Sequence, residues 1–397
     1  MQLEKVNLNI EHLSIWLSDT QGIVYHQGHK SLYRLEPLSL ALLFALDDGI
    51  NEQQTISELQ QHSPLSAEQI APSMQQVKAL MVNDQIDRTY ADGLYPEFNS
   101  HFKQQVKPGD FTLKVANSTF AITSQDHELL SHLKTLLAPI TLNNEAGDIT
   151  EVDFLFEIEH PNEIYTLYSN DQAVEENLTQ EQVMPVLIDR LQILSYQQSP
   201  YTFGFHGAAL ESINADNPHR VLLPGISGAG KSTLTAELSK QGYQVFSDEI
   251  IAINDDHTLN TLELPMAIKS GSWQHIAKLY PEITTQPEWH RVDGRILKYI
   301  WPEQIAHNKT AELVDVQKSI KTLLISPNYQ AGCEPQIKAL SIIETIELVT
   351  NGGYQLGVEL TEQRVEQLID FCQSISAYQI TYASSAQAQK IINELVN

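Results

Sequence analysis

The sequence predicts an α/β phosphate-binding domain with a β-rich first portion, preceded by a small winged-helix-like α+β domain. Three observations lead to this fold class. A loop of the pattern G-x-x-x-x-G-K-S lies between an apolar strand and a helix, which is the context such a loop needs. The residues before it alternate as strands do, and residues 1–88 combine short strands with three helices. A length of 397 residues agrees with two or three domains.

The chain is strongly acidic: 50 acidic residues against 24 basic ones give a formal charge of −26. Such a surface repels nucleic acid and anionic lipid, so neither nucleic acid nor a membrane is expected as a partner. One local loop can still hold phosphate against this overall field. Cys333 and Cys372 are far apart and have no neighbours at ligand spacing, which argues against a disulfide framework or a zinc site.

No segment has the pattern of a targeting or membrane signal. The first residues lack a basic region followed by an apolar stretch. The longest strongly apolar run, residues 38–46, is about half of the roughly 20 residues that a membrane helix needs. We therefore expect a cytoplasmic protein, which agrees with a need for ATP.

Residues 1–88 form the first predicted domain. After strand-like segments, Pro37 fits the first turn of a helix whose apolar residues wrap most of the way round, so this helix should be buried. A second helix should start at Thr55. Ser66 and Gln69 resemble a capping box for the third helix, which presents an apolar stripe. The stripe consists of Val77, Leu80 and Met81.

The order Leu35-x-Pro37, Leu46-x-x-Gly49 and Thr55-Ile56-x-x-Leu59 resembles the PqqD family of peptide-binding domains, also called precursor-peptide recognition elements. The resemblance implies that an edge strand and the third helix clamp a leader peptide by strand addition. A winged-helix dimerisation or regulatory module remains an alternative. DNA binding is disfavoured by the acidic charge balance.

Residues 89–107 are polar and irregular and are expected to form a linker. Residues 108–397 should form the second domain, with a β-rich part over 108–198 and a nucleotide-binding core over 199–397. The β-rich part carries predicted strands and two helices, at 129–137 and 180–196. The strands are expected at 111–115, 119–122, 152–156 and 164–168.

The Gly-rich loop follows the strand at residues 221–224 and precedes a helix that continues through Thr233 to Leu238. Its glycines allow successive backbone N–H groups to turn inward around a phosphate, and the helix adds its N-terminal dipole. Lys231 would reach the β- and γ-phosphates of ATP, and the Ser232 hydroxyl would bind Mg²⁺. The predicted nucleotide-binding residues are Gly225, Ser227, Gly228, Ala229, Gly230, Lys231, Ser232 and Thr233.

A second acidic element is needed to hold magnesium and to accept a proton. Asp248 and Glu249 supply it within a predicted strand at residues 244–253. Neighbouring residues on a strand point to opposite sides, so one carboxylate can bind the metal while the other acts as a base. An exposed acidic pair at a strand end is the alternative.

Further candidates are one histidine and a group of basic residues. His206 lies on the strand before the loop strand, and a packed histidine without a role is the alternative. Arg291, Arg295 and Lys298 stand out against the acidic background and could contact a transferring phosphate or an acidic substrate. A solvated hairpin with local ion pairs would explain them equally well.

Residues 108–397 resemble the catalytic domain of the HPr serine kinase family, which shares its fold with PEP carboxykinase. The matching segments are His206-Gly207, the loop at 225–232, Gly242-Tyr243, Ser247-Asp248-Glu249, Leu264-Pro265, Lys269-Ser270-Gly271-Ser272-Trp273 and Ile325-Ser326-Pro327-Asn328-Tyr329. The resemblance implies that Lys231 and Ser232 bind ATP and Mg²⁺. It also implies that Asp248 and Glu249 serve magnesium and the acceptor, and that His206 lies beside the phosphates.

The chain departs from that family in three places. Thr233 stands where bacterial HPr kinases have Glu, and Glu249 stands where they usually have Asp. Their Glu-x-Arg-Gly-x-Gly signature, used in handling the phosphoprotein, is not found. HPr itself is therefore a poor candidate substrate, and phosphorolysis is unsupported.

The leading hypothesis is an ATP-dependent kinase for a Ser or Thr hydroxyl on a peptide or small protein that the N-terminal domain captures. A ribosomal precursor peptide is one candidate. A small-molecule kinase and a non-catalytic, nucleotide-gated peptide-binding protein are the alternatives. The sequence does not identify the acceptor, the phosphoryl donor beyond ATP as the first choice, or a homo-oligomer. Nor does it decide whether phosphorylation is the end product or activates a later elimination.

Overall fold

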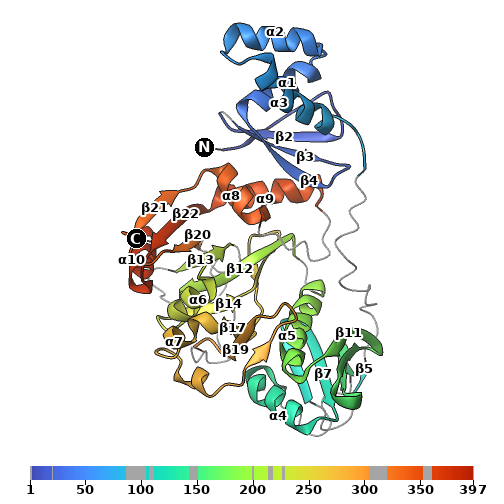
Figure 1. Cartoon of the computed structure of the whole chain (residues 1–397), viewed down its shortest axis with the longest axis vertical. Helices are drawn as coiled ribbons and strands as arrows, with labels where there is room; N and C mark the ends of the chain where they lie inside the picture. Colours follow the sequence, from blue (N-terminus) through green and yellow to red (C-terminus); the bar gives the residue numbers. More distant parts are fainter. Residues whose placement is uncertain are drawn as a thin grey trace. The chain divides into compact units, whose positions relative to one another are not determined.

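A computed structural model describes the chain at residues 2–19, 21–85, 104–106, 111–142, 151–198, 201–212, 218–225, 229–303, 320–351 and 360–396 (Figure 1). It is a mixed α/β protein with several sheets and divides into two compact units. The N-terminal unit contains Met1–Leu94, Ala339–Asn351 and Val358–Ser376. The core unit contains Tyr95–Lys338, Gly352–Gly357 and Ala377–Asn397. Most of the predicted linker at 89–107 lies outside the described residues.

The N-terminal unit is built on an antiparallel sheet in the order β1-β2-β3-β4. Its strands are β1 (Glu4–Val6), β2 (Leu13–Leu17), β3 (Gly22–His26) and β4 (Ser31–Leu35), and three helices follow: α1 (Pro37–Asp47), α2 (Glu52–His62) and α3 (Ala67–Leu80). Pro37 lies in the first turn of α1, as predicted. The capping box of Ser66 and Gln69 is also confirmed. The second helix begins before Thr55, because the Asn51 side chain caps it by accepting a hydrogen bond from the Gln54 N–H.

Both faces of this sheet are buried. One face packs against α1 and α3 in an apolar cluster that includes Ile15 and Val24. The alternation of strand side chains puts Trp16, Ile23 and Tyr25 on the opposite face, and these residues are only 3, 2 and 4% exposed. A sheet buried on both faces needs a second helical layer.

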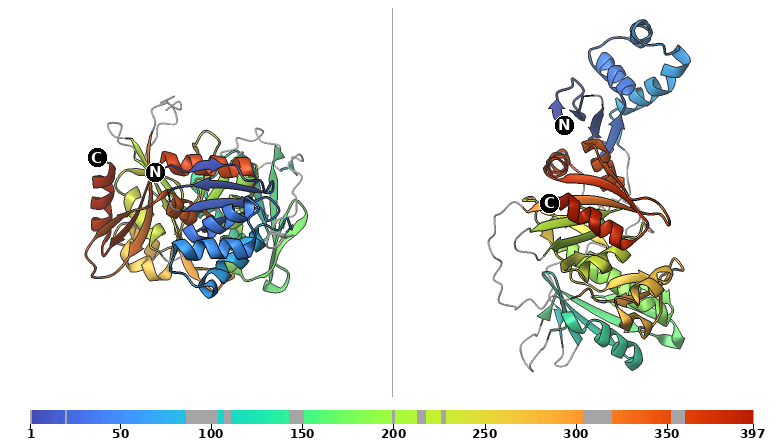
Figure 2. Two further views of the ribbon diagram at one scale, coloured as in Figure 1. Left: turned by 90° about the horizontal axis from the view of Figure 1, so that it is seen from above. Right: turned by 90° about the vertical axis from the view of Figure 1, so that its left-hand side faces the viewer.

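The helices α8 (Ile342–Asn351) and α9 (Glu362–Ser374) contact this sheet (Figure 1, Figure 2). The Tyr25 hydroxyl donates to the Leu360 carbonyl at 2.7 Å, and Lys5 pairs with Glu362 at 2.7 Å. Arg34 of β4 pairs with Glu347 of α8 at 2.9 Å. The sequence had placed both helices in the domain at 108–397. The structure groups them with the N-terminal sheet, and the hydrogen bond and ion pairs above join them to it.

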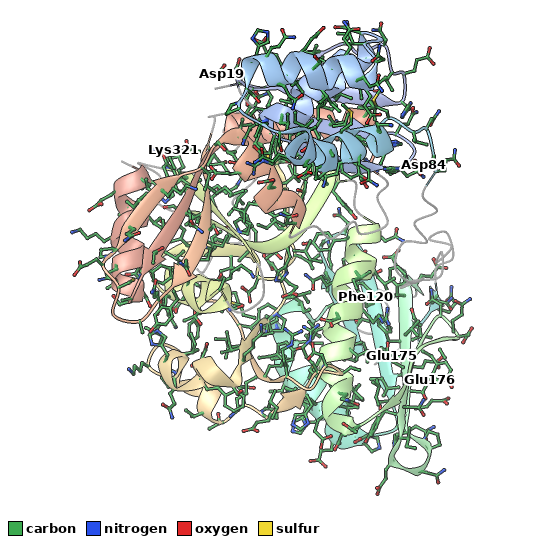
Figure 3. All side chains as sticks on the ribbon, turned by 45° about the horizontal axis from the view of Figure 1, so that its top comes forward. Asp19, Asp84, Phe120, Glu175, Glu176 and Lys321 are labelled. Atoms are coloured by element: carbon green, nitrogen blue, oxygen red, sulfur yellow. The ribbon has the colours of Figure 1, made fainter. Side chains whose placement is uncertain are left out.

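The first part of the core unit is a five-stranded sheet in the order β11-β10-β9-β7-β6. Its strands are β6 (Phe111–Val115), β7 (Ser118–Ser124), β9 (Phe154–Glu159), β10 (Tyr165–Ser169) and β11 (Gln172–Leu178), and a short pair is formed by β5 (Gln104–Gln105) and β8 (Glu151–Val152). The helices α4 (His127–Leu136) and α5 (Gln180–Gln197) contribute to its core. Phe120, labelled in Figure 3, stacks with Phe154 and Phe156. The ring centroids are 5.2 and 5.9 Å apart.

The larger sheet of the core unit has the order β16-β15-β12-β13-β20-β22-β21, with β14 also paired to β12. Its strands are β12 (Phe203–Ser212), β13 (His219–Pro224), β14 (Tyr243–Ser247), β15 (Ile250–Ile253), β16 (Leu259–Asn260), β20 (Lys321–Tyr329), β21 (Gln336–Ala339) and β22 (Ser376–Tyr382). The helices α6 (Lys231–Ser239) and α10 (Ser385–Val396) pack on one face through an apolar cluster. Strand β13 is parallel to β20 and antiparallel to β12.

A small sheet in the order β17-β19-β18 completes the core unit. It consists of β17 (Met266–Lys269), β18 (Trp289–His290) and β19 (Ile296–Ile300), with the short helix α7 (Trp273–Ile276) after β17. Met266 and Ile268 of β17 pack against Ala236 of α6. This contact fixes the small sheet beside the helix that follows the Gly-rich loop. Among the helices that the structure describes, none is both long and apolar enough to cross a membrane.

Candidate active site

The Gly-rich loop leaves β13 at Pro224 and enters α6 at Lys231. Gly225 and Gly230 have φ angles of 138° and 89°, in the region that favours glycine. The predicted residues Ser227 and Gly228 lie outside the described residues. Lys231 is buried and its Nζ donates to the Gly225 carbonyl at 2.6 Å. The lysine thus closes the described ends of the loop onto each other.

The environment of Lys231 is only partly favourable to its charge. Burial lowers the pKa of its ammonium, while the carboxylates of Glu249 and Asp248 act in the opposite direction. An added anion at this position would stabilise the charged form. The start of α6 favours an anion there too, because the helix dipole is positive at this end and no side chain caps the described start of the helix.

The acidic pair does not lie within a strand. The predicted single strand at 244–253 is wrong, because Asp248 and Glu249 form a break between β14 and β15. Both of these strands pair antiparallel with β12, so the break lies opposite Gly207. The Gly207 N–H donates to the Glu249 carbonyl at 3.0 Å. A Cβ atom at residue 207 would come within 2.7 Å of the Leu223 carbonyl oxygen, so glycine is required for this close approach.

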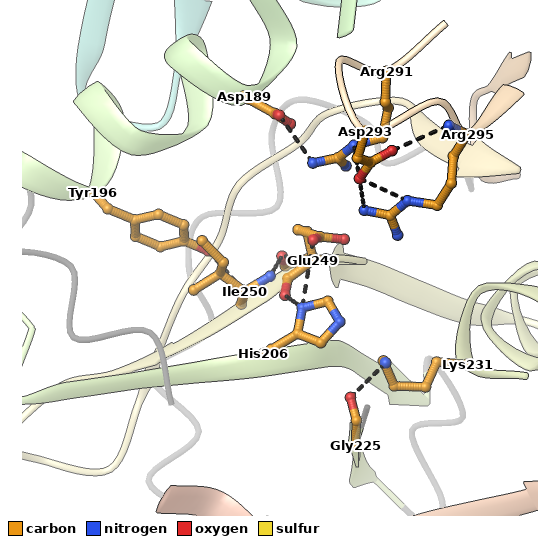
Figure 4. A network of polar contacts seen from close by, with 11 residues as sticks. Asp189, Tyr196, His206, Gly225, Lys231, Glu249, Ile250, Arg291, Asp293 and Arg295 are labelled. Atoms are coloured by element: carbon orange, nitrogen blue, oxygen red, sulfur yellow. Dashed lines mark hydrogen bonds and ion pairs between the residues drawn. The ribbon is translucent and has the colours of Figure 1, made fainter. Parts of the chain in front are cut away.

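Other hydrogen bonds hold the break in place. The Ser247 hydroxyl accepts from the Glu249 and Ile250 N–H groups at 3.4 and 3.2 Å. The fully buried Tyr196 of α5 donates its hydroxyl to the Ile250 carbonyl at 2.7 Å (Figure 4). The two carboxylates are therefore positioned by their backbone and not by a flexible loop.

One carboxylate oxygen of Asp248 has no hydrogen-bond partner among the described residues. This Oδ1 atom is buried. Burial raises the pKa of Asp248 to about 7, and the neighbouring Glu249 charge adds to this. Hydrogen bonding by Ser232 and Thr235 and the charge of Lys231 act in the opposite direction. A divalent cation would satisfy this oxygen. The donor set of Ser232, Asp248 and Glu249 supplies only oxygen atoms, as Mg²⁺ prefers.

His206 of β12 lies directly beside the acidic pair. The register pairs Gly207 with Pro224, so His206 is level with the beginning of the loop (Figure 4). Its Nδ1 is 2.8 Å from the Glu249 carbonyl oxygen and 3.5 Å from the Glu249 Oε1. Burial lowers the pKa of His206, and the charges of Lys231 and Lys269 lower it further, against the effect of Glu249. The neutral imidazole is therefore favoured.

The predicted basic group forms a tight hairpin whose arginines are held by carboxylates (Figure 4). Arg291 contacts Asp189 of α5 at 3.2 Å and Asp293 at 3.7 Å, and Arg295 also pairs with Asp293. Hydrogen bonding by Arg295 lowers the pKa of Asp293 to about 2. Burial raises the pKa of Asp189 to about 6, although Arg291 opposes this. The structure therefore contains the local ion pairs that the sequence analysis gave as the alternative to phosphate contacts.

Lys298 does not join Arg291 and Arg295. It is buried, and its Nζ lies 4.7 Å from the centre of the Trp273 ring and 3.9 Å from Glu288. Strand β19 pairs Lys298 with Ile268, whereas Leu297 pairs with Lys269. Because paired residues share a face, Lys298 and Lys269 project from opposite faces of the small sheet.

The structure brings together Lys231, Asp248, Glu249 and His206 as the sequence predicted. Thr233 lies in the first turn of α6, and its hydroxyl donates to the Ser272 hydroxyl at 3.1 Å. Sequence reasoning gave no role to Asp189 and Lys269. The sequence signal for Asp189 is a carboxylate within the largely apolar helix α5. Nothing near it in the sequence indicates Arg291 as its partner.

A second group of polar residues lies in the N-terminal unit. Ligand atoms of His26, His29 and Asp84 lie within 4.8 Å of one another, a spacing that a metal ion could span. Each imidazole nitrogen already has a partner, however. His26 contacts the Val82 carbonyl oxygen at 2.9 Å and accepts from the His29 N–H at 3.1 Å, and His29 contacts Tyr33 at 2.8 Å and Asp84 at 2.7 Å. We assign this group a structural role.

No protein-family model matches the chain, and a search of curated proteins found no match. The assignment of a function therefore depends on the site itself. Its defining features are a lysine that closes a Gly-rich loop, two carboxylates in a strand break, and a buried carboxylate oxygen with no described partner.

Proposed function

We propose that the protein is an ATP-dependent phosphotransferase whose core unit is a P-loop kinase domain of the HPr kinase and PEP carboxykinase type. The observation that supports this most directly is the unsatisfied Oδ1 atom of Asp248 at the start of α6. A buried carboxylate oxygen without a hydrogen-bond partner is costly, and a metal ion bound with a nucleotide would supply the partner that this oxygen lacks.

The chain's own groups divide the work of nucleotide binding. The backbone N–H groups of the loop and of the α6 N-terminus would hold the phosphates of ATP, and Lys231 would neutralise the β- and γ-phosphates. Ser232, Asp248 and Glu249 would hold Mg²⁺, which supplies charge stabilisation to the phosphates when bound. His206 would keep Glu249 in place through its contact at Nδ1.

Transfer requires a base for the acceptor hydroxyl. The acceptor oxygen forms a bond to the terminal phosphorus as the bond from that phosphorus to the bridging oxygen of ADP breaks. The hydroxyl proton passes to a carboxylate, and Asp248 is the better candidate because its pKa of about 7 lies near the working pH. The metal would then be held by Ser232, Glu249 and the one Asp248 oxygen that has no described partner, and the second Asp248 oxygen would accept the proton.

We further propose a Ser or Thr hydroxyl of a peptide or small protein as the acceptor. The N-terminal unit supports this, because its four-stranded sheet and three following helices agree with a PqqD-like, winged-helix peptide-binding domain. Its outer strand β1 pairs only with β2 among the described strands, so a peptide strand has an edge to join. Capture would raise the local substrate concentration to the order of millimolar.

The test measures ATP binding and ATP turnover for the full chain and for Asp248→Asn. We expect turnover to fall about 10²- to 10⁴-fold because the base is lost, with a much smaller change in ATP affinity. The exposed Asp370→Asn variant is the control. Incubation with labelled ATP and peptides encoded near the gene, followed by mass spectrometry, would then identify the acceptor.

Two results would contradict the proposal. One is an Asp248→Asn variant that turns over ATP at the wild-type rate. The other is a wild-type protein that binds ATP and transfers phosphate to none of the candidate peptides, which would leave only the nucleotide-binding part.

A further inference from the structure

Lys269 lies next to the start of α6 although it is far from the Gly-rich loop in sequence. It is the last residue of β17, and Ile268 before it packs against Ala236 of α6. Ser272, three positions later, accepts a hydrogen bond from Thr233 in the first turn of α6. The backbone on both sides of Lys269 is therefore fixed to the helix that carries Lys231.

The side chain of Lys269 lies on the face of the small sheet that does not pack on α6. Ile268 faces α6, so Lys269 lies on the other face of the small sheet, together with its register partner Leu297. Leu297 belongs to the same apolar cluster as Ile250, which directly follows Glu249. Lys269 thus shares a face with a residue of the apolar cluster that includes Ile250.

Electrostatic effects agree with this placement. The charge of Lys269 lowers the pKa of both His206 and Lys231. Burial and the charge of Arg295 lower the pKa of Lys269 itself, while Glu249 acts in the opposite direction. Two lysines therefore share one small region with Glu249, and an additional anion between them would relieve their mutual repulsion.

We propose that Lys269 binds the terminal phosphoryl group of ATP from the side opposite the Gly-rich loop, and so makes the site distinguish ATP from ADP. This inference rests on the proposed function and adds a residue to the same site. Lys231 approaches from the loop and contacts the inner and terminal phosphates, whereas Lys269 would contact the terminal group alone.

The chemistry of the step explains why a second lysine is useful. Negative charge spreads over the oxygens of the phosphoryl group during transfer, and one loop lysine covers one side of it. Arg291 and Arg295 are already paired with Asp189 and Asp293, so their charges are largely matched. Lys298 points to the other face. Among these basic residues, Lys269 is the one whose position suits this task.

The experiment compares binding of ADP and of a non-hydrolysable ATP analogue, each with Mg²⁺, to the full chain by calorimetry. The variants are Lys269→Met, Lys269→Arg and, as a matched control, the exposed Lys278→Met shortly after α7. We expect Lys269→Met to weaken the affinity for the ATP analogue by about 10- to 100-fold, which is the effect of one lost charged hydrogen bond. The affinity for ADP should be nearly unchanged. Lys269→Arg should keep most of the preference, and Lys278→Met should keep all of it.

Each outcome decides the inference. Equal losses of ADP and analogue affinity in Lys269→Met would overturn it, because they indicate a general effect on the fold or on the inner phosphates. An unchanged preference would overturn it while leaving the proposed function intact. Binding of neither nucleotide to the wild type would remove both. Thermal melting of each variant shows whether Lys269→Met folds, and Lys269→Arg provides the second comparison if it does not.

Discussion

The two polar clusters of this chain, one in each unit, differ in how completely their hydrogen bonds are satisfied. His26 and His29 stack with ring centroids 3.5 Å apart, and their four ring nitrogens all have protein partners. In the core unit, Asp248 keeps a buried oxygen without a described partner, beside the partly desolvated charge of Lys231.

This difference separates a structural cluster from a candidate active site better than residue type does. Histidines and a carboxylate at metal-like spacing would attract attention in any sequence. Their partners show that the fold already uses them, whereas a buried carboxylate oxygen that lacks a partner requires something from outside the chain. If the comparison is right, substitutions in the two clusters should affect different measurements.

The largest effect is expected for Lys231→Met. Removing the ammonium leaves the phosphates without their closest cation and frees the Gly225 carbonyl, so ATP affinity should fall by about 100-fold or more. The melting temperature should change little, because burial already makes the charged form of Lys231 costly in the native protein. Calorimetric titration with Mg²⁺-ATP measures the affinity, and the exposed Lys390→Met is the control. Unaltered affinity would mean that the Gly-rich loop does not bind nucleotide.

His26→Ala should give the reverse pattern. The side chain is fully buried, and its loss opens a cavity and removes two hydrogen bonds, so the free energy of unfolding should fall by about 2–3 kcal/mol. Denaturant titration measures this loss, with the exposed His62→Ala as the control. ATP affinity should stay at the wild-type value. A stable His26→Ala protein that had lost a bound metal would show that the cluster was misassigned.

The smallest effect is the pH dependence caused by Asp248. The carboxylate is the active form, so kcat/KM should rise with pH by about tenfold and level off above the pKa of Asp248, which is about 7 in the metal-free site. Stability should move the other way. Because the folded pKa is raised above the ordinary value of 3.8, the folded state holds a proton that the unfolded state has lost, and stability decreases as pH rises from about 4 to 7.

Asp248→Asn tests both trends at once. It should flatten the rate profile and remove this part of the pH dependence of stability, as measured by denaturant titration at several pH values. Metal binding favours the carboxylate, so the kinetic midpoint should lie below the one seen in stability. Parallel profiles for the wild type and Asp248→Asn would assign the titration to another group.

Local features of the fold could be predicted from the sequence. Pro37 marked a helix start and Ser66 marked a cap, because these residues act through their own backbone and that of close neighbours. The components of the candidate site followed from the loop motif and the acidic pair in the same way.

Features that depend on distant segments could not be predicted. The run from Gln244 to Ile253 is apolar enough for one strand, and its break at Asp248 depends on Gly207, whose N–H holds the Glu249 carbonyl. Lys269 lies in a segment that resembles the kinase family, but no role could be given to it because its neighbourhood is set by strand register. The basic residues with a local signal, Arg291 and Arg295, are bound in ion pairs.

The helices α8 and α9 have a consequence for how this protein can be divided. Their segments come from residues 339–376, so the N-terminal unit is encoded in pieces near both ends of the gene. A fragment ending at residue 88 would lack these helices and leave Trp16, Ile23 and Tyr25 without their cover, which favours aggregation. Neither unit can be separated from the other by cutting the chain at one position. A transfer of the N-terminal unit to another protein would have to include both pieces.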